Sequence, residues 1–210
     1  MSATPNADPA FHDVAELDSA IVYRLMSGSI APRPIAWVST VDAEGNANLA
    51  PFSFFNVASV DPPVLAFAPL LDGQARSKDT INNLRAVGEC VVHIGGEALI
   101  EALNATSATL APGEDEFAHA GLEKATLGKL RVPRIAAAPI AFGCRLHQII
   151  DFGDRPRAGR LVLAEVVVIH ADPAVWDGRH VDLATLRPVG RLAGADYCRA
   201  SDLFALERPA

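Results

Sequence analysis

The stretch NLAPFSFFN, residues 48 to 56, mixes three phenylalanines with a proline and small hydrogen-bonding residues. Side chains in a strand alternate between the two faces of the sheet. One face would then carry Asn48, Ala50, Phe52, Phe54 and Asn56, and the other Leu49, Pro51, Ser53 and Phe55. Each face combines apolar bulk with polar groups. Pro51 cannot donate to a sheet ladder, which leaves nearby backbone groups free for a ligand. The stretch predicts either a core strand or a strand that lines a binding site.

Further strand signals surround this stretch. IAWVST at 35 to 40 has strand composition, and the turn DAEGN at 42 to 46 joins it to the stretch as a hairpin. The prolines at 62 and 63 end the second run, and VLAFAP at 64 to 69 is the next expected strand. These strands lie close together in the sequence and are expected to form one sheet.

The rest of the chain contains few helix signals. DTINNLRAVG at 79 to 88 has apolar residues at helical spacing and a terminal glycine, and ALIEALNATSA at 98 to 108 predicts a second helix. ECVVHIG at 89 to 95 predicts a strand, and the segments 138 to 152 and 161 to 172 predict a long hairpin. Residues 112 to 125 and 181 to 198 have loop composition. We expect a mainly β chain, an antiparallel barrel of about six strands with short helices.

Length and composition favour one soluble domain. The chain has 210 residues, half of them hydrophobic, and a net charge of −7, which argues against nucleic-acid and anionic-membrane partners. No apolar run reaches the roughly 18 to 20 residues that span a bilayer. The three cysteines lie far apart and no secretory signal is present, so we expect reduced thiols and a cytoplasmic protein. The expected domain covers residues 21–200, with a flexible lead-in at 1–20 and a tail at 201–210.

Several familiar sites are absent from the sequence. It has no G-x-G-x-x-G after a strand, no G-x-S-x-G, and no histidine or cysteine spacing suited to a metal, so no metal is expected. RSKDT at 76 to 80 stands at the start of the first amphipathic helix, where free N–H groups and the helix dipole favour an anion. A phosphate monoester fits this pattern. The alternative is a surface helix start capped by Ser77 or Asp79. An isoalloxazine ring is apolar on its faces and amide-like on one edge, so it matches the apolar side chains and free polar groups expected at NLAPFSFFN.

At this point the motifs resemble a known family. RPIAWVST at 33 to 40, NLAPFSFFN, DPPVLAF at 61 to 67, RSKDT, FAHAGL at 117 to 122 and RPVGRLAGADY at 187 to 197 are similar, in this order, to the flavin reductase-like family of FMN-binding split barrels. The resemblance implies an antiparallel, Greek-key-like split β-barrel. It also implies a homodimer that binds FMN and uses NADH or NADPH as co-substrate.

The resemblance also implies roles for individual residues. Those that line the flavin ring and ribityl chain are Ser39, Thr40, Asn48, Ala50, Ser53 and Asn56. Those at the phosphate are Arg76, Lys78, Asp79 and Thr80, with Asp79 as a cap or positioner. Candidates for the nicotinamide side are His119, Arg191 and Tyr197, while Trp37 is expected to be a core aromatic. No general acid or base is assigned, because hydride passes directly between the two cofactors.

One motif departs from the family pattern. Flavin reductases that work with two-component monooxygenases often have Gly-Asp-His before the strand that here reads LVLAEVVVIH, and this chain has Gly153-Asp154-Arg155. The histidine that the resemblance associates with nicotinamide binding is missing, so the departure affects the expected use of NADH or NADPH and not the expected binding of FMN. Two alternatives to an NAD(P)H-dependent reductase therefore stay open. One is a flavoredoxin-like electron-transfer protein that serves an acceptor protein or a monooxygenase. The other is a non-catalytic flavin- or tetrapyrrole-binding barrel.

Overall fold

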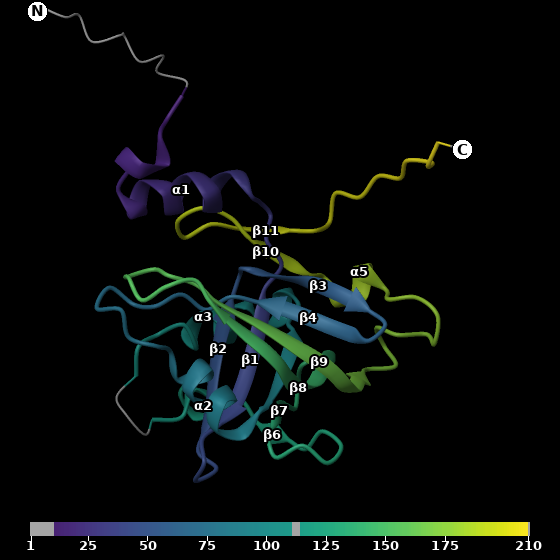
Figure 1. Cartoon of the computed structure of the whole chain (residues 1–210). Helices are drawn as coiled ribbons and strands as arrows, with labels where there is room; N and C mark the ends of the chain where they lie inside the picture. Colours follow the sequence, from purple (N-terminus) through teal and green to yellow (C-terminus); the bar gives the residue numbers. More distant parts are fainter. Residues whose placement is uncertain (1–10, 111–113, 210) are drawn as a thin grey trace, which may run out of the picture.

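The computed structural model describes residues 11–110 and 114–209, so the start of the predicted lead-in and part of the 112–125 loop lie outside the described residues. Its centre is a seven-stranded sheet in the order β2-β1-β5-β8-β9-β4-β3, with every neighbouring pair antiparallel (Figure 1). These strands are β1 (Ala36–Val41), β2 (Ala47–Phe52), β3 (Phe55–Val60), β4 (Pro63–Phe67), β5 (Glu89–Ile94), β8 (Ile140–Asp151) and β9 (Arg160–Ala171). The expected antiparallel β fold is confirmed.

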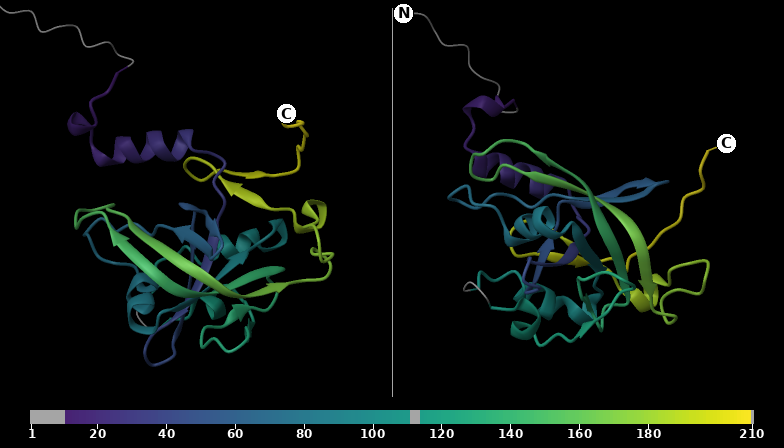
Figure 2. Two further views of the ribbon diagram at one scale, coloured as in Figure 1. Left: turned by 45° about the vertical axis from the view of Figure 1, so that its right-hand side comes forward. Right: turned by 60° about the horizontal axis from the view of Figure 1, so that its bottom comes forward.

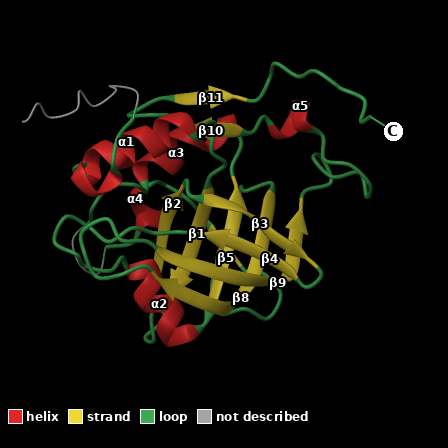
Figure 3. Cartoon of the chain, turned by 45° about the horizontal axis from the view of Figure 1, so that its top comes forward, coloured by secondary structure: helices red, strands yellow, loops and turns green. Residues whose placement is uncertain are grey.

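The two outermost strands of this sheet are consecutive in the sequence. Among the described strands, β2 pairs only with β1 and β3 pairs only with β4, and Ser53 and Phe54 connect β2 to β3. β3, β4 and β9 cross over β1, β2 and β5 (Figure 3). The sheet thus curls so that its two edge strands, β2 and β3, come close to each other without backbone hydrogen bonds that pair them as neighbouring strands. Side chains close this split, since the rings of Phe52 and Phe67 stack with centroids 5.8 Å apart.

The structure corrects the expected single alternation through NLAPFSFFN. The chain turns at Ser53 and Phe54, so the alternation holds along β2 and starts again in β3. Phe52 and Phe55 both pack against the barrel core, although strict alternation placed them on opposite faces. The physical reason is the split, because a chain that passes from one sheet edge to the other cannot keep one register.

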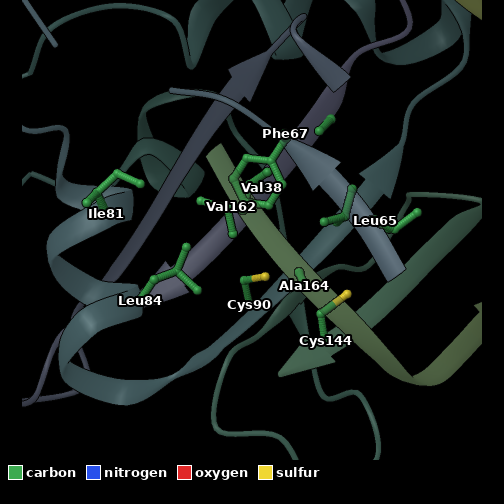
Figure 4. Packing of buried hydrophobic residues seen from close by; sticks show 11 residues of the cluster. Val38, Leu65, Phe67, Ile81, Leu84, Cys90, Cys144, Val162 and Ala164 are labelled. Atoms are coloured by element: carbon green, nitrogen blue, oxygen red, sulfur yellow. The ribbon is translucent and has the colours of Figure 1, made fainter. Parts of the chain in front are cut away.

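The barrel interior is an apolar cluster contributed by most strands and by α2 (Asp79–Val87). Val38, Phe67 and Leu84 are fully buried there, and Ile81 and Leu84 of α2 close one end of the barrel (Figure 4). Cys90 and Cys144 face each other across β5 and β8 within this cluster and are free thiols. α2 ends at Gly88, whose φ of 75° allows the left-handed turn that the sequence predicted.

A second core covers the outer face of β1 and β2. Trp37 is fully buried in it and donates from Nε1 to the Thr106 hydroxyl at 2.8 Å, so its expected role as a core aromatic is confirmed. The covering elements are η2 (Glu97–Leu99), α3 (Ile100–Ala105), α4 (Glu116–His119), β6 (Lys124–Ala125) and β7 (Arg134–Ile135). β1 is consequently buried on both faces. This cover also carries one wall of the site described below.

The remaining elements lie at the other end of the barrel from α2. They are η1 (Val14–Glu16), α1 (Ser19–Ser29), α5 (Leu183–Leu186), β10 (Val189–Arg191) and β11 (Tyr197–Arg199). α1 lies at the same end of the molecule as the β10–β11 pair (Figure 2), and Ser19 of α1 accepts from Arg157 in the β8–β9 turn at 3.2 Å. Sequence composition had suggested only loop for residues 181–198 and for the segment that contains α4. Within the described residues, no helix is long and apolar enough to cross a membrane.

Candidate functional site

A cavity of about 640 Å³ lies where the open edge of β2 meets the start of α2. Its other walls are the turn before β2, the segment after α3, and α4. This volume lies within the range of small-molecule and cofactor sites, roughly 300 to 1,000 Å³. The polar or charged residues that line it are Asp42, Asn46, Asn48, Lys78, Asp79, Thr80, Asn83, Thr106, Ser107, Thr109, Glu114, Asp115, Glu116 and Lys124.

A network of side-chain hydrogen bonds forms the floor of the cavity. The Asn48 amide donates to the Thr80 hydroxyl at 3.1 Å and thereby joins β2 to α2. Behind it, the buried Thr40 hydroxyl accepts from the Asn83 amide at 3.0 Å. Because these bonds hold the two amides in place, their remaining polar atoms are preorganised toward a ligand.

The first turn of α2 presents free donors to the cavity. Lys78 is the N-cap residue and its side chain makes no capping bond. Within the described part of the chain, the N–H groups of Asp79 and Thr80 have no acceptor. Neither Ser77 nor Asp79 caps the helix, so the alternative of an ordinary capped surface start is not supported. Free N–H groups, the helix dipole and the Lys78 ammonium together fit a phosphate group.

The wall opposite α2 is acidic. Glu116 accepts a hydrogen bond at 3.1 Å from the N–H of Leu49, on the unpaired edge of β2. Burial raises the pKa of Glu116, and the nearby charges of Asp115 and Asp79 raise it further. Lys124 forms an ion pair with Asp115 and lies 5.2 Å from the centre of the Phe117 ring. The α2 end of the cavity therefore offers Lys78 and free N–H groups beside the Asp79 carboxylate, and the α4 end offers carboxylates beside Lys124.

Five of the residues that the sequence predicted line this cavity. They are Asn48, Ala50, Lys78, Asp79 and Thr80. Thr40 is buried directly behind the lining and acts on it through Asn48 and Asn83. Ser39 is also buried, but it donates to the Pro133 carbonyl at 2.7 Å on the side of the second core.

The other predicted flavin and phosphate residues lie outside the lining. Ser53 follows the lining residue Phe52 and accepts from Arg33 at 3.3 Å. Asn56 is exposed on β3 and accepts from the Val57 N–H. Arg76 pairs with Asp72 at 2.7 Å, and hydrogen bonds from the backbone N–H and then the side chain of Arg76 lower the pKa of Asp72 to about 2.

The candidates for the nicotinamide side lie in other places. His119 is exposed in the last turn of α4, away from the cavity lining. Arg191 and Tyr197 pair across β10 and β11, and the guanidinium lies 4.5 Å from the centre of the tyrosine ring. Tyr197 also contacts the Asn104 side chain on α3. Their roles stay predictions, because none of the three lines the cavity beside Lys78.

Sequence reasoning missed several lining residues. Asn83 follows Thr80 by one helical turn, so helix periodicity was a signal that could have found it. Glu116 and Lys124 come from the segment that composition marked as a loop, and Thr106 follows α3. No local signal points to these three, because only the tertiary fold brings them against β2. Within the described residues, no group of side chains is arranged to bind a metal ion.

The split barrel and its cofactor-sized cavity agree with the class of protein that the comparisons with known proteins indicate, a flavoprotein of the oxidoreductase class. A flavin reductase-like domain matches residues 26–183, and the chain belongs to the flavin reductase-like family. The uncharacterized protein YwrF of Bacillus subtilis is 38% identical over 198 residues, which cover 92% of this chain and 96% of that protein.

Solved structures agree with this assignment. Nitrilotriacetate monooxygenase component B from Bacillus cereus superposes with a TM-score of 0.87 at 33% identity, and the match covers 98% of this chain and 100% of that chain. The 2-nitrobenzoate 2-nitroreductase NbaA from Pseudomonas fluorescens has a TM-score of 0.85 at 31% identity, with 95% and 96% covered. The similarity thus extends over the whole barrel and its decorations.

Proposed function

We propose that this protein is a reductase that uses NADH or NADPH to reduce FMN held in the cavity beside β2 and α2. When bound, FMN would accept a hydride from the nicotinamide at its N5 atom. The chain's own residues need supply only binding, orientation and electrostatics. This division agrees with a cavity in which amides, hydroxyls and one lysine face the ligand from fixed elements.

The observation that carries the proposal is the pair of free N–H groups at Asp79 and Thr80, beside Lys78 and at the floor of a cofactor-sized cavity. In the proposal these groups bind the phosphate. Asn48 lies beside the ribityl chain, and Ala50 and Phe52 lie against the ring. The small side chain of Ala50 lets a flat ring approach the strand closely.

The proposal includes a cytoplasmic homodimer. α1 buries only Ser27, and Ile21, Leu25 and Met26 are exposed on it. A second apolar area lies on the sheet, where Val60 and Ile169 are 84% and 59% exposed. In the proposal a two-fold copy of the chain covers these side chains, because a two-fold interface brings the same patch of both subunits into contact. Size-exclusion chromatography with light scattering tests this part.

The proposal also concerns the nicotinamide donor and the protein that receives the reduced flavin. The Gly153-Asp154-Arg155 turn is held by Arg160, whose Nη2 donates to Asp154 Oδ1 at 2.8 Å. This turn is thus held in place by Arg160, although it lacks the histidine of the Gly-Asp-His motif. A monooxygenase that consumes reduced flavin is the partner we propose, in line with the component B structure that the chain resembles.

The test is the anaerobic visible spectrum of the purified protein with FMN, first alone and then with NADH and NADPH. We expect FMN to bind and its absorption to bleach with one or both donors. Flavin that binds but stays oxidised would contradict the nicotinamide part and favour an electron-transfer protein. Failure to bind FMN would overturn the proposal as a whole.

Matched variants locate the phosphate. Lys78→Ala is expected to weaken FMN binding roughly tenfold, because a charge-assisted hydrogen bond is lost. The affinity for riboflavin, which lacks the phosphate, should stay unchanged. Lys129→Ala removes an exposed lysine outside the lining and serves as the control. Equal losses for FMN and riboflavin in Lys78→Ala would contradict a phosphate site at α2.

A further inference from the structure

Arg33 is a buried cation at the split of the barrel. The residue is 6% exposed and lies just before β1. The guanidinium donates to the Ile30 carbonyl at 3.0 Å and to Leu192, in the β10–β11 connection, at 2.9 Å. It also donates to the Ser27 carbonyl and lies 6.0 Å from the centre of the Phe54 ring. One side chain thus joins α1, β10–β11 and the β2–β3 turn.

The charge on Arg33 has no carboxylate partner among the described residues. Its acceptors are neutral carbonyls and one hydroxyl. The carbonyls of Ser27 and Ile30 belong to the C-terminal end of α1, where the helix dipole favours a cation. This dipole offsets part of the free-energy cost of burying the Arg33 charge. It is equivalent to less than one full negative charge, so it does not neutralise the guanidinium. A net positive potential therefore remains behind the β2–β3 turn.

Ser53 connects Arg33 to the neighbourhood of the cavity. Arg33 Nε lies 3.3 Å from Ser53 Oγ and can only donate, so the oxygen accepts on its buried side. Within the described chain the Ser53 hydroxyl proton has no acceptor of its own. Ser53 is half-buried and directly follows Phe52, which lines the cavity. Its O–H group is thus free to donate to a ligand, one residue beyond the lining against which the proposed function puts the flavin ring.

We propose that Arg33 is a positioning residue that makes the Ser53 hydroxyl a charge-assisted donor to the polar rim of the bound flavin ring. The inference rests on the proposed function. A donor backed by a positive charge favours the ring most when the ring carries additional negative charge. Reduced FMN is therefore bound more tightly, relative to oxidised FMN, than it would be without Arg33.

The experiment measures the midpoint potential of protein-bound FMN by anaerobic dye-coupled titration, alongside the affinity for oxidised FMN. Arg33→Gln is expected to lower the preference for reduced over oxidised FMN about tenfold, the size of one charge-assisted hydrogen bond. This corresponds to a potential about 30 mV lower for a two-electron couple. Arg33→Lys keeps the charge without the planar fork and should restore part of the shift.

Ser53→Ala separates the proposed role from a structural one. This half-buried position loses only a hydroxyl, so the variant is expected to fold even where Arg33→Gln does not. It should show the same shift as Arg33→Gln, and the double variant should show no further shift. Arg85→Gln, which removes an exposed arginine paired with Asp151, is the charge control and should leave the potential unchanged.

The outcomes distinguish this inference from the proposed function. FMN that binds to Ser53→Ala with the potential of the unaltered protein overturns the inference and leaves the proposed function standing. Additive shifts from Arg33→Gln and Ser53→Ala also overturn it, because Arg33 would then act without Ser53. If the unaltered protein binds no FMN, both the proposed function and the inference are wrong.

Discussion

We predict that His93 makes the stability of this protein depend on pH. It is fully buried on β5, opposite Trp37 of β1. Its Nδ1 lies 2.7 Å from the Trp37 carbonyl, which can only accept, and its Nε2 lies 3.0 Å from the Ile135 N–H, which can only donate. The ring is therefore neutral with the proton on Nδ1. A second proton would break the bond to Ile135 and place a charge in the second core.

The size of the effect follows from the pKa. Burial lowers the pKa of His93 from 6.5 to about 4. Above pH 6.5 both the folded and the unfolded chain hold a neutral ring, and the contribution to stability is complete. Between pH 6.5 and 4 only the unfolded chain takes up the proton, so stability falls. At about 1.4 kcal/mol for each pH unit, the loss across this window is on the order of 3 kcal/mol.

Urea denaturation between pH 7.5 and 4 measures this loss. We expect His93→Asn to be less stable at pH 7.5, since it keeps the bond to Trp37 but loses the acceptor for Ile135. Its stability should vary much less between pH 6.5 and 5. His147→Asn changes an exposed histidine and should keep the full slope. An unaltered protein with constant stability between pH 6.5 and 5, or the same slope in His93→Asn, would show that His93 does not set the pH dependence.

Two further predictions concern packing and the acidic wall. Gly143→Ala should lower the free energy of unfolding by about 1 to 3 kcal/mol through overpacking, because a Cβ there would lie 2.5 Å from both Leu130 Cδ1 and Val168 Cγ1. Gly73→Ala, with no neighbour within 4 Å, is the control in the same denaturation experiment. Burial raises the pKa of Glu116, so its charge disfavours folding at neutral pH, and this cost disappears as acidification protonates it. Glu116→Gln should therefore be more stable than the unaltered protein at pH 7 but not at pH 4.5, and lower stability at pH 7 would contradict this.

Much of the local structure could be predicted from the sequence. α2 was expected from its apolar spacing and Gly88, and the β8–β9 hairpin from its long apolar runs around a turn. The family motifs predicted the split barrel as well. These signals are local, since they depend on the side-chain period and on the backbone preferences of glycine and proline.

Sequence signals predicted most strands of the large sheet, the helix α2 and the residue types at the start of α2. The tertiary fold makes β2 and β3 opposite edges of one sheet, and NLAPFSFFN therefore turns at Ser53. The tertiary structure also decided that Asn83 bonds to Thr40, 43 residues away, and Glu116 to Leu49, 67 residues away. Such contacts depend on how the whole sheet curls and on which faces are left to cover, and no short window of sequence carries that information.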